Sequence, residues 1–217
     1  MKLSSLFALK TKLEEPKLWS PDTPTLYTVT TRVFVGKTEV DKCDARFGFR
    51  TIFADSQKGL FINGKHYKIQ GVCGHADCGL MGKAVPDNIH RYKVRLMREM
   101  GANGYRTTHY PQASALMDAF DENGFIVMNE TRWYESTEEG KQQLEMLVKR
   151  DRNRPSVIFW SIGNEEPIHI NEKGRRIAKS LYSFVKKLDS TRYIMTAISY
   201  YPPDATVHDT LDVIGIN

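Results

Sequence analysis

Several features that would mark other classes of protein are missing from this sequence. No apolar stretch approaches the roughly 20 residues that a helix needs to cross a bilayer, so a membrane span is not expected. No run of five or six like charges occurs either, because the 31 lysines and arginines are interspersed with the 26 aspartates and glutamates. The net charge of +5 therefore indicates a mixed, solvated surface and not a patch that binds nucleic acid.

Cysteine and phosphate-binding loops are equally scarce. The three cysteines, Cys43, Cys73 and Cys78, are an odd number in a chain of 217 residues and imply no disulfide framework. Neither GxGxxG nor GxxxxGK[ST] occurs, so the sequence lacks the main motifs that would indicate a nucleotide cofactor. The hydrophobic content of 41% and the charged content of 26% are ordinary for a folded globular protein.

The first part of the chain carries signals for β-strands alone. Residues 26–35 are rich in β-branched and aromatic side chains, Gly36 and Lys37 can form a turn, and residues 46–53 follow as a further strand. Residues 1–12 hold too short an apolar segment for a secretory signal and are interpreted as a strand. Three strands with no helix between them predict part of an antiparallel sandwich.

After Gly59, six short apolar runs alternate with longer amphipathic segments. The runs are residues 68–72, 104–108, 126–128, 157–160, 194–198 and 213–216. Short apolar runs are typical of parallel strands that are covered on both faces. The segments between them predict four helices: one from Pro86 to Gly101, one ended by Gly124, one with a capping box of Ser136 and Glu139, and one opened by Asn171. Repeated strand–helix units fit either an open doubly wound sheet or a (β/α)8 barrel.

Polar and ionisable residues follow one run after another. They are His75 after the first, Arg106 and His109 after the second, Glu130 after the third, Asn164, Glu165 and Glu166 after the fourth, and Asn217 after the sixth. Such groups at the carboxyl ends of successive strands are the layout of a barrel active site. A doubly wound sheet would gather its ligand groups at one switch point, so the pattern favours the barrel.

The segment RDRNRPSVIFWSIGNE, residues 150–165, resembles the acid/base signature of glycoside hydrolase family 2, the β-galactosidase and β-glucuronidase family. Further segments resemble other parts of that family in the same order. Residues 18–27 and 47–50 resemble its immunoglobulin-like domain, residues 61–75 its first barrel strand, and residues 101–111 and 120–125 the surroundings of the second.

This resemblance implies a fold and a domain boundary. The expected fold is a truncated (β/α)8 TIM barrel preceded by part of an immunoglobulin-like β-sandwich. Residues 1–56 are expected to form the partial sandwich domain, and residues 57–217 the amino-terminal part of the catalytic barrel.

The resemblance also implies roles for single residues. Glu165 matches the general acid/base, and Asn164 matches the neighbour that binds the sugar 2-hydroxyl. The other implied substrate-binding positions are His75, which contacts the sugar, Arg106 and His109, which line the floor of the site, and Glu130 after the third strand. Glu166 is interpreted as a surface charge beside the catalytic glutamate.

The implied activity is retaining hydrolysis of terminal β-galactosides. A β-glucuronidase of the same family and an inactive carbohydrate-binding scaffold are the alternatives. The family's nucleophile follows the seventh strand and residues 213–217 resemble the sixth, so we expect the nucleophile downstream and the chain alone to be inactive. The implied partner is a carbohydrate, with no nucleic acid, membrane or required cofactor. A divalent or monovalent cation and a homo-oligomer are compatible with the full-length enzyme.

Two further hypotheses come from the residues alone. Cys73, His75 and Cys78 are ligand types that suit zinc, but one C-x4-C with one histidine lacks a second ligand pair. A basic nucleic-acid-binding module would use Arg91, Lys93, Arg95 and Arg98. No aromatic-rich recognition strand accompanies these four residues.

Overall fold

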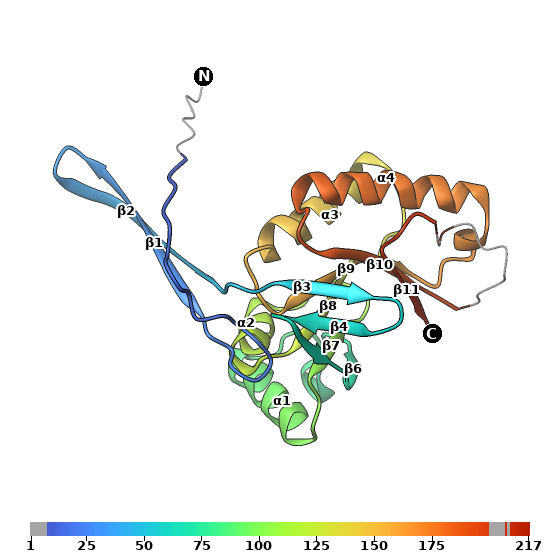
Figure 1. Cartoon of the computed structure of the whole chain (residues 1–217), viewed down its shortest axis with the longest axis horizontal. Helices are drawn as coiled ribbons and strands as arrows, with labels where there is room; N and C mark the ends of the chain where they lie inside the picture. The colour runs from blue at the N-terminus through green and yellow to red at the C-terminus, as the bar shows by residue number, and fades with distance from the viewer. Residues whose placement is uncertain (1–7, 200–206, 208) are drawn as a thin grey trace.

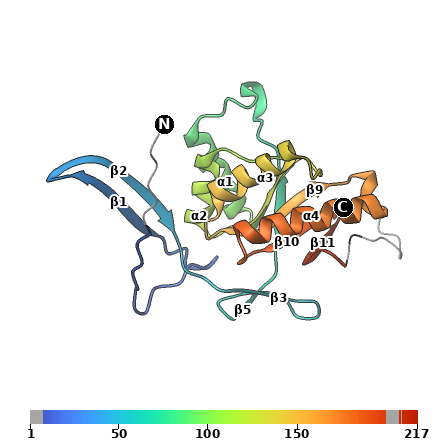
Figure 2. The same cartoon turned by 90° about the horizontal axis from the view of Figure 1, so that it is seen from above.

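The computed structural model describes residues 8–199, 207 and 209–217. A long β-hairpin extends away from a larger part, in which a curved sheet is covered by helices (Figures 1 and 2). The hairpin consists of β1 (Tyr27–Val35) and β2 (Thr38–Phe47), which pair antiparallel around the predicted turn. Of the predicted strand over residues 1–12, residues 1–7 lie outside the described part of the chain, and residues 8–12 form no strand.

The predicted strand over residues 46–53 is wrong, because the chain leaves the hairpin at Gly48 and starts a new strand only at Ile52. A Cβ on Gly48 would lie 2.9 Å from the Pro155 side chain. Arg50 donates hydrogen bonds to the carbonyl oxygens of Pro155 and Val157, at 2.6 and 2.7 Å. Docking on the barrel therefore interrupts the alternating pattern that the sequence suggests.

A small antiparallel sheet lies at one end of the larger part. It contains β3 (Ile52–Asp55), β4 (Gly59–Ile62) and β5 (Lys65–Tyr67), so its pairing spans the predicted domain boundary at residue 56. Leu60, Ile62 and Tyr67 pack with Ile126 and Ile158, which lie at the amino-terminal ends of their strands. This sheet therefore covers the amino-terminal end of the barrel.

In the described part of the chain, six parallel strands form the curved sheet. They are β6 (Gly71–Gly74), β7 (Gly104–Thr107), β8 (Ile126–Glu130), β9 (Val157–Asn164), β10 (Tyr193–Ile198) and β11 (Val213–Ile216). Each strand pairs with the next along the chain, and the six correspond to the six predicted apolar runs. Sequential order is the topology of a TIM barrel, whereas a doubly wound sheet reverses direction at a switch point.

Helices connect the parallel strands and cover the outer face of the sheet (Figure 2). They are α1 (Asp87–Glu99), α2 (Ser114–Asn123), α3 (Glu138–Asp151) and α4 (Glu172–Leu188), with short 3-10 turns η1 (Gly79–Met81) and η2 (Pro167–Ile170). Asn171 caps α4 as predicted, by accepting a hydrogen bond from the Gly174 amide. The capping residue of α3 is Thr137 and not the predicted Ser136, because the Thr137 hydroxyl is the group that reaches the Gly140 amide.

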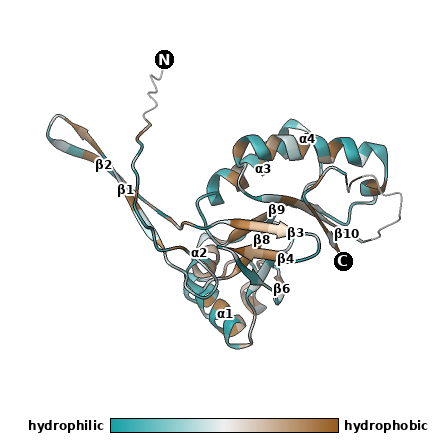
Figure 3. Ribbon diagram, in the orientation of Figure 1, coloured by the Kyte–Doolittle hydropathy of each residue, from teal (hydrophilic) through white to brown (hydrophobic). Residues whose placement is uncertain are grey.

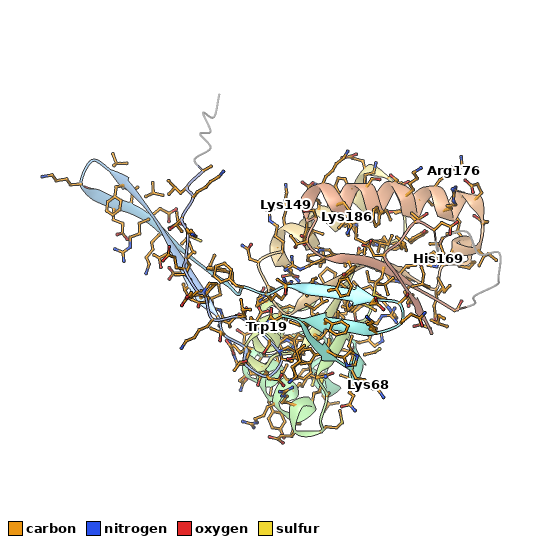
Figure 4. All side chains as sticks on the ribbon, viewed as in Figure 1. Trp19, Lys68, Lys149, His169, Arg176 and Lys186 are labelled. Carbon is orange, nitrogen blue, oxygen red and sulfur yellow. The ribbon has the colours of Figure 1, made fainter. Side chains whose placement is uncertain are left out.

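The main core lies between the sheet and these helices. Its largest fully buried side chains include Trp160, Phe120 and Phe125. Hydrophobic residues concentrate on the strands, whereas α4 alternates between hydrophobic and hydrophilic residues (Figure 3). Trp19, fully buried and labelled in Figure 4, donates a hydrogen bond to the Asp121 carbonyl oxygen and so ties the first part of the chain to α2. No helix in the described residues is long and apolar enough to span a membrane.

Candidate active site

The predicted site residues gather at one edge of the curved sheet, where the parallel strands end. Arg106 lies near the end of β7, Glu130 at the end of β8, and Asn164 at the end of β9. Asn217 directly follows β11. The carboxyl-terminal edge of the strands is the place where barrel enzymes carry their active sites.

Glu130 is the buried anion of this edge. Its carboxylate is fully buried and accepts hydrogen bonds from Arg106 Nε and Nη2 at 3.0 and 2.9 Å and from Ser161 Oγ at 2.7 Å. His109 Nδ1 lies 2.6 Å from the other carboxylate oxygen. The Glu130 amide donates to the Thr107 hydroxyl, which fixes the backbone as well. A buried carboxylate needs such partners, and here Arg106 balances its charge.

Arg106 extends the network toward the glutamate at the end of β9. Its Nη2 binds Asn164 Oδ1, and its Nη1 donates to Asn217 Oδ1 at 2.9 Å. Asn217 Nδ2 in turn donates to Asn164 Oδ1 at 2.9 Å and to Glu165 Oε1 at 2.7 Å. The buried carboxylate of Glu130 and the exposed carboxylate of Glu165 are therefore joined through Arg106 and two asparagines.

Glu165 turns away from the strand into the solvent-exposed rim. Its backbone has a φ of 53°, a value that residues other than glycine rarely adopt. Its amide donates to the Ala197 carbonyl oxygen at 2.8 Å. A left-handed residue of this kind costs about 1–2 kcal/mol and persists where its surroundings hold it. The neighbouring Glu166 forms an ion pair with Arg132 at 2.6 Å, outside this network.

His75 lies beside the network and not within it. The residue is exposed, and its ring meets the His109 ring edge to face, with centroids 5.5 Å apart. The Tyr110 ring lies 6.3 Å from the His75 ring on the same loop as His109. His75 therefore adds an exposed imidazole to the rim through aromatic contacts.

The structure brings Arg106, His109, Glu130, Asn164 and Glu165 into one hydrogen-bonded network and places His75 against it. Two members of the network were not among the predicted site residues. Ser161 lies inside β9, just after the predicted run over residues 157–160, and only its pairing opposite Glu130 identifies it as a partner of that carboxylate. Asn217 is identified from the sequence as the polar residue after the last run, but without a predicted role.

The competing hypotheses gain no support from the described residues. No group of three or more histidine, cysteine, aspartate or glutamate side chains in that part of the chain could hold a metal ion. Arg91 pairs with Glu122, and Arg98 donates to the Pro21 carbonyl oxygen. Arg91 and Arg98 thus take part in contacts within the fold.

A buried histidine, His169, lies behind this edge and gives the fold a dependence on pH. Burial lowers the pKa of His169 from its ordinary 6.5 to about 4, while the nearby Glu166 opposes this shift. The folded state therefore favours the neutral imidazole. Stability from this source is complete above the unfolded-state pKa near 6.5 and is lost as the pH falls toward 4.

We expect this loss to be about 2 kcal/mol at pH 5. Urea unfolding of the chain at pH 7.5 and pH 5 measures it. His169→Gln, which cannot take up the proton, should lose less stability between the two values than the wild type does. Equal pH dependence in the wild type and in His169→Gln would contradict the assignment.

Known proteins resemble this chain in sequence and fold over most of its length. The model of the glycosyl hydrolases family 2 TIM barrel domain matches residues 54–138 and 135–217, and the glycosyl hydrolases family 2 model matches residues 2–50. The β-galactosidase BoGH2A of Bacteroides ovatus is 33% identical in a match that covers 98% of this chain and 30% of that protein. The β-glucuronidase of Bacteroides fragilis is 32% identical, over 83% of this chain and 28% of that protein.

A solved structure agrees with these relatives. The crystal structure of a glycosyl hydrolase family 2 member from Bacteroides cellulosilyticus matches with a TM-score of 0.87 and 36% identity, over 93% of this chain and 28% of that one. The chain thus spans less than a third of the length of each of these proteins. The expected fold is confirmed: the parallel sheet is part of a TIM barrel, and the antiparallel strands before it fit an immunoglobulin-like sandwich. With its sequence matched almost from end to end by the family's models, the chain belongs to glycosyl hydrolase family 2.

Proposed function

We propose that the whole protein hydrolyses terminal β-galactosides with retention of configuration and that Glu165 is its general acid/base. The observation that carries this proposal is the position of Glu165. Its carboxyl group is exposed at the rim of the barrel, and Asn217 holds it at 2.7 Å. Cleavage of a glycosidic bond needs a carboxylic acid that can reach the leaving oxygen, and an exposed, oriented side chain at a strand end meets this need.

A retaining mechanism needs a second carboxylate, about 5–5.5 Å from the first, as the nucleophile. Glu130 is unsuited to this role, because its oxygens are fully buried and already bound by Arg106, Ser161 and His109. Glu166 is paired with Arg132. We therefore place the nucleophile in the remainder of the whole protein. The two steps use carboxyl groups and water, so we propose no cofactor.

Sugar binding is proposed for the residues around Glu165. Asn164 Oδ1 accepts from Arg106 and Asn217, and within the described residues its amide NH₂ has no partner, so this group is proposed to donate to a sugar hydroxyl. His75 offers an exposed imidazole at the rim. Arg106, His109 and Glu130 form the floor that holds these groups in place.

A β-glucuronidase is the second candidate, because the relatives include the β-glucuronidase of Bacteroides fragilis at 32% identity. The whole protein should be incubated with matched aryl β-galactosides and aryl β-glucuronides, and the first-formed sugar followed by proton NMR. We expect faster turnover of the galactoside, with the β-anomer appearing first. Preference for the glucuronide would support the second candidate, and the α-anomer first would refute retention. Binding without turnover would indicate an inactive scaffold.

A further inference from the structure

Three buried side chains lie behind the Asn164–Glu165 pair: Tyr134 from the loop after β8, His169 from η2 and Thr196 from β10. We call these three residues the Gly163 clamp, because they converge on Gly163. Figure 4 labels His169, which lies below the start of α4. The exposed fractions are 6% for Tyr134, 1% for His169 and 0% for Thr196, so solvent does not compete for their contacts.

The polar part of the clamp runs from His169 through Thr196 to the backbone. Thr196 Oγ1 donates to the Gly163 carbonyl oxygen at 2.8 Å, which uses its only proton. His169 Nε2 lies 3.5 Å from the same hydroxyl and must therefore be the donor of that weak hydrogen bond. This assigns the proton of the neutral imidazole to Nε2. The other nitrogen, Nδ1, is buried without a partner among the described residues.

The apolar part of the clamp is the Tyr134 ring. It meets the His169 ring edge to face, with centroids 4.2 Å apart, and its hydroxyl donates to the Gly174 carbonyl oxygen at 2.7 Å. A Cβ on Gly163 would lie 2.8 Å from Tyr134, so a larger residue could not occupy this position without displacing the ring. The ring therefore packs closely against both His169 and Gly163.

Gly163 lies two residues before Glu165, where the pairing of β9 with β10 is irregular. The register shifts between Met195 and Ala197, opposite Gly163, and Thr196 is the residue between them. Bulges of this kind re-aim side chains next to active sites. The left-handed backbone of Glu165 follows directly and needs support from its surroundings.

We propose that His169 is a positioning residue, which acts through Thr196 and the Gly163 carbonyl to hold the Asn164–Glu165 turn in the geometry from which Glu165 delivers its proton. The proposal rests on the proposed role of Glu165. On this proposal, the Gly163 clamp supports proton transfer by Glu165, beyond any contribution that it makes to the stability of the barrel. A small displacement of the turn would move the carboxyl group away from the leaving oxygen, to which proton transfer is sensitive.

The test compares Thr196→Val, which keeps the shape and removes the hydroxyl, with Thr196→Ser, which keeps the hydroxyl. In the whole protein, Thr196→Val should lower kcat/KM about tenfold or more for a substrate with a poor leaving group. For an activated aryl glycoside, which needs little protonation, kcat/KM should fall by about twofold or less. The alkaline limb of the pH profile of kcat/KM should shift in the same variant, whereas Thr196→Ser should match the wild type.

His169→Gln is a second test variant. Because the glutamine amide can still donate to Thr196, its kcat/KM for the substrate with a poor leaving group should lie between the values of the wild type and Thr196→Val. A lower melting temperature with an unchanged ratio between the two substrates would show a purely structural clamp and overturn the inference. Glu165→Gln separates the two proposals. If that variant discriminates between the substrates and Thr196→Val does not, the inference alone fails. If neither discriminates, the proposed role of Glu165 fails and the inference fails with it.

Discussion

Replacing Glu165 with glutamine in the whole protein should lower kcat/KM by roughly 10²–10⁴-fold for substrates with poor leaving groups, the range that general acid catalysis contributes. The exposed carboxyl group at the end of β9 is the proposed proton donor, and glutamine keeps its size but cannot donate an acidic proton. The aryl group of an activated aryl glycoside departs without being protonated, so kcat/KM for these substrates should change far less than for substrates with poor leaving groups. A series of aryl glycosides of graded leaving-group pKa measures this difference as a steeper dependence of kcat/KM on that pKa.

The matched control is Glu166→Gln. Glu166 is adjacent in sequence but is bound to Arg132 and not to the network of Glu165. Its replacement should leave the leaving-group dependence unchanged. If Glu166→Gln caused the larger loss, or if Glu165→Gln slowed all substrates equally, the acid/base would have been assigned to the wrong residue.

Glu130→Gln should reduce the free energy of unfolding by about 3–5 kcal/mol, the cost of leaving one member of a buried ion pair without its partner. Arg106, with an exposed side-chain fraction of 12%, would keep its charge beside a neutral amide. Activity should fall too, because Arg106 also binds Asn164 and Asn217. Urea unfolding of the chain measures the first effect, and kcat/KM of the whole protein measures the second.

A surface glutamate provides the comparison for Glu130. Glu122 pairs with Arg46 and Arg91, but all three side chains are partly exposed, and its change to glutamine should cost about 1 kcal/mol or less. The double variant of Glu130→Gln with Arg106→Met should regain part of the lost stability, since no unpaired charge then remains. Similar losses for Glu122→Gln and Glu130→Gln would contradict the assigned burial energetics.

Much of the site could be predicted because all parallel strands of a barrel end at the same edge. The residues after each apolar run, such as Arg106, Glu130 and Glu165, could therefore be grouped without any knowledge of distances. The contacts between neighbouring strands could not be predicted. Ser161 reaches Glu130 only because β9 lies beside β8 in one register, which pairs these two residues directly. Asn217 follows the last run, but its contacts depend on β11 pairing with β10.

The wrong strand prediction over residues 46–53 has its cause in tertiary contacts. Residues 46–53 have the local pattern of one strand, yet Gly48 and Arg50 dock on Pro155, about a hundred positions along the chain. His169 follows Glu165 by four residues, but no spacing in the sequence relates it to Tyr134 or Thr196. Local pattern predicts which elements form, whereas these contacts depend on how the elements pack.

The small sheet of β3, β4 and β5 also has a consequence for how molecules reach and leave the site. Leu60, Ile62 and Tyr67 close the barrel at the ends of the strands opposite Glu165. Under the proposed function, a sugar would therefore reach Glu165, and its product would leave, at the carboxyl-terminal edge of the strands and not at the end that this small sheet covers.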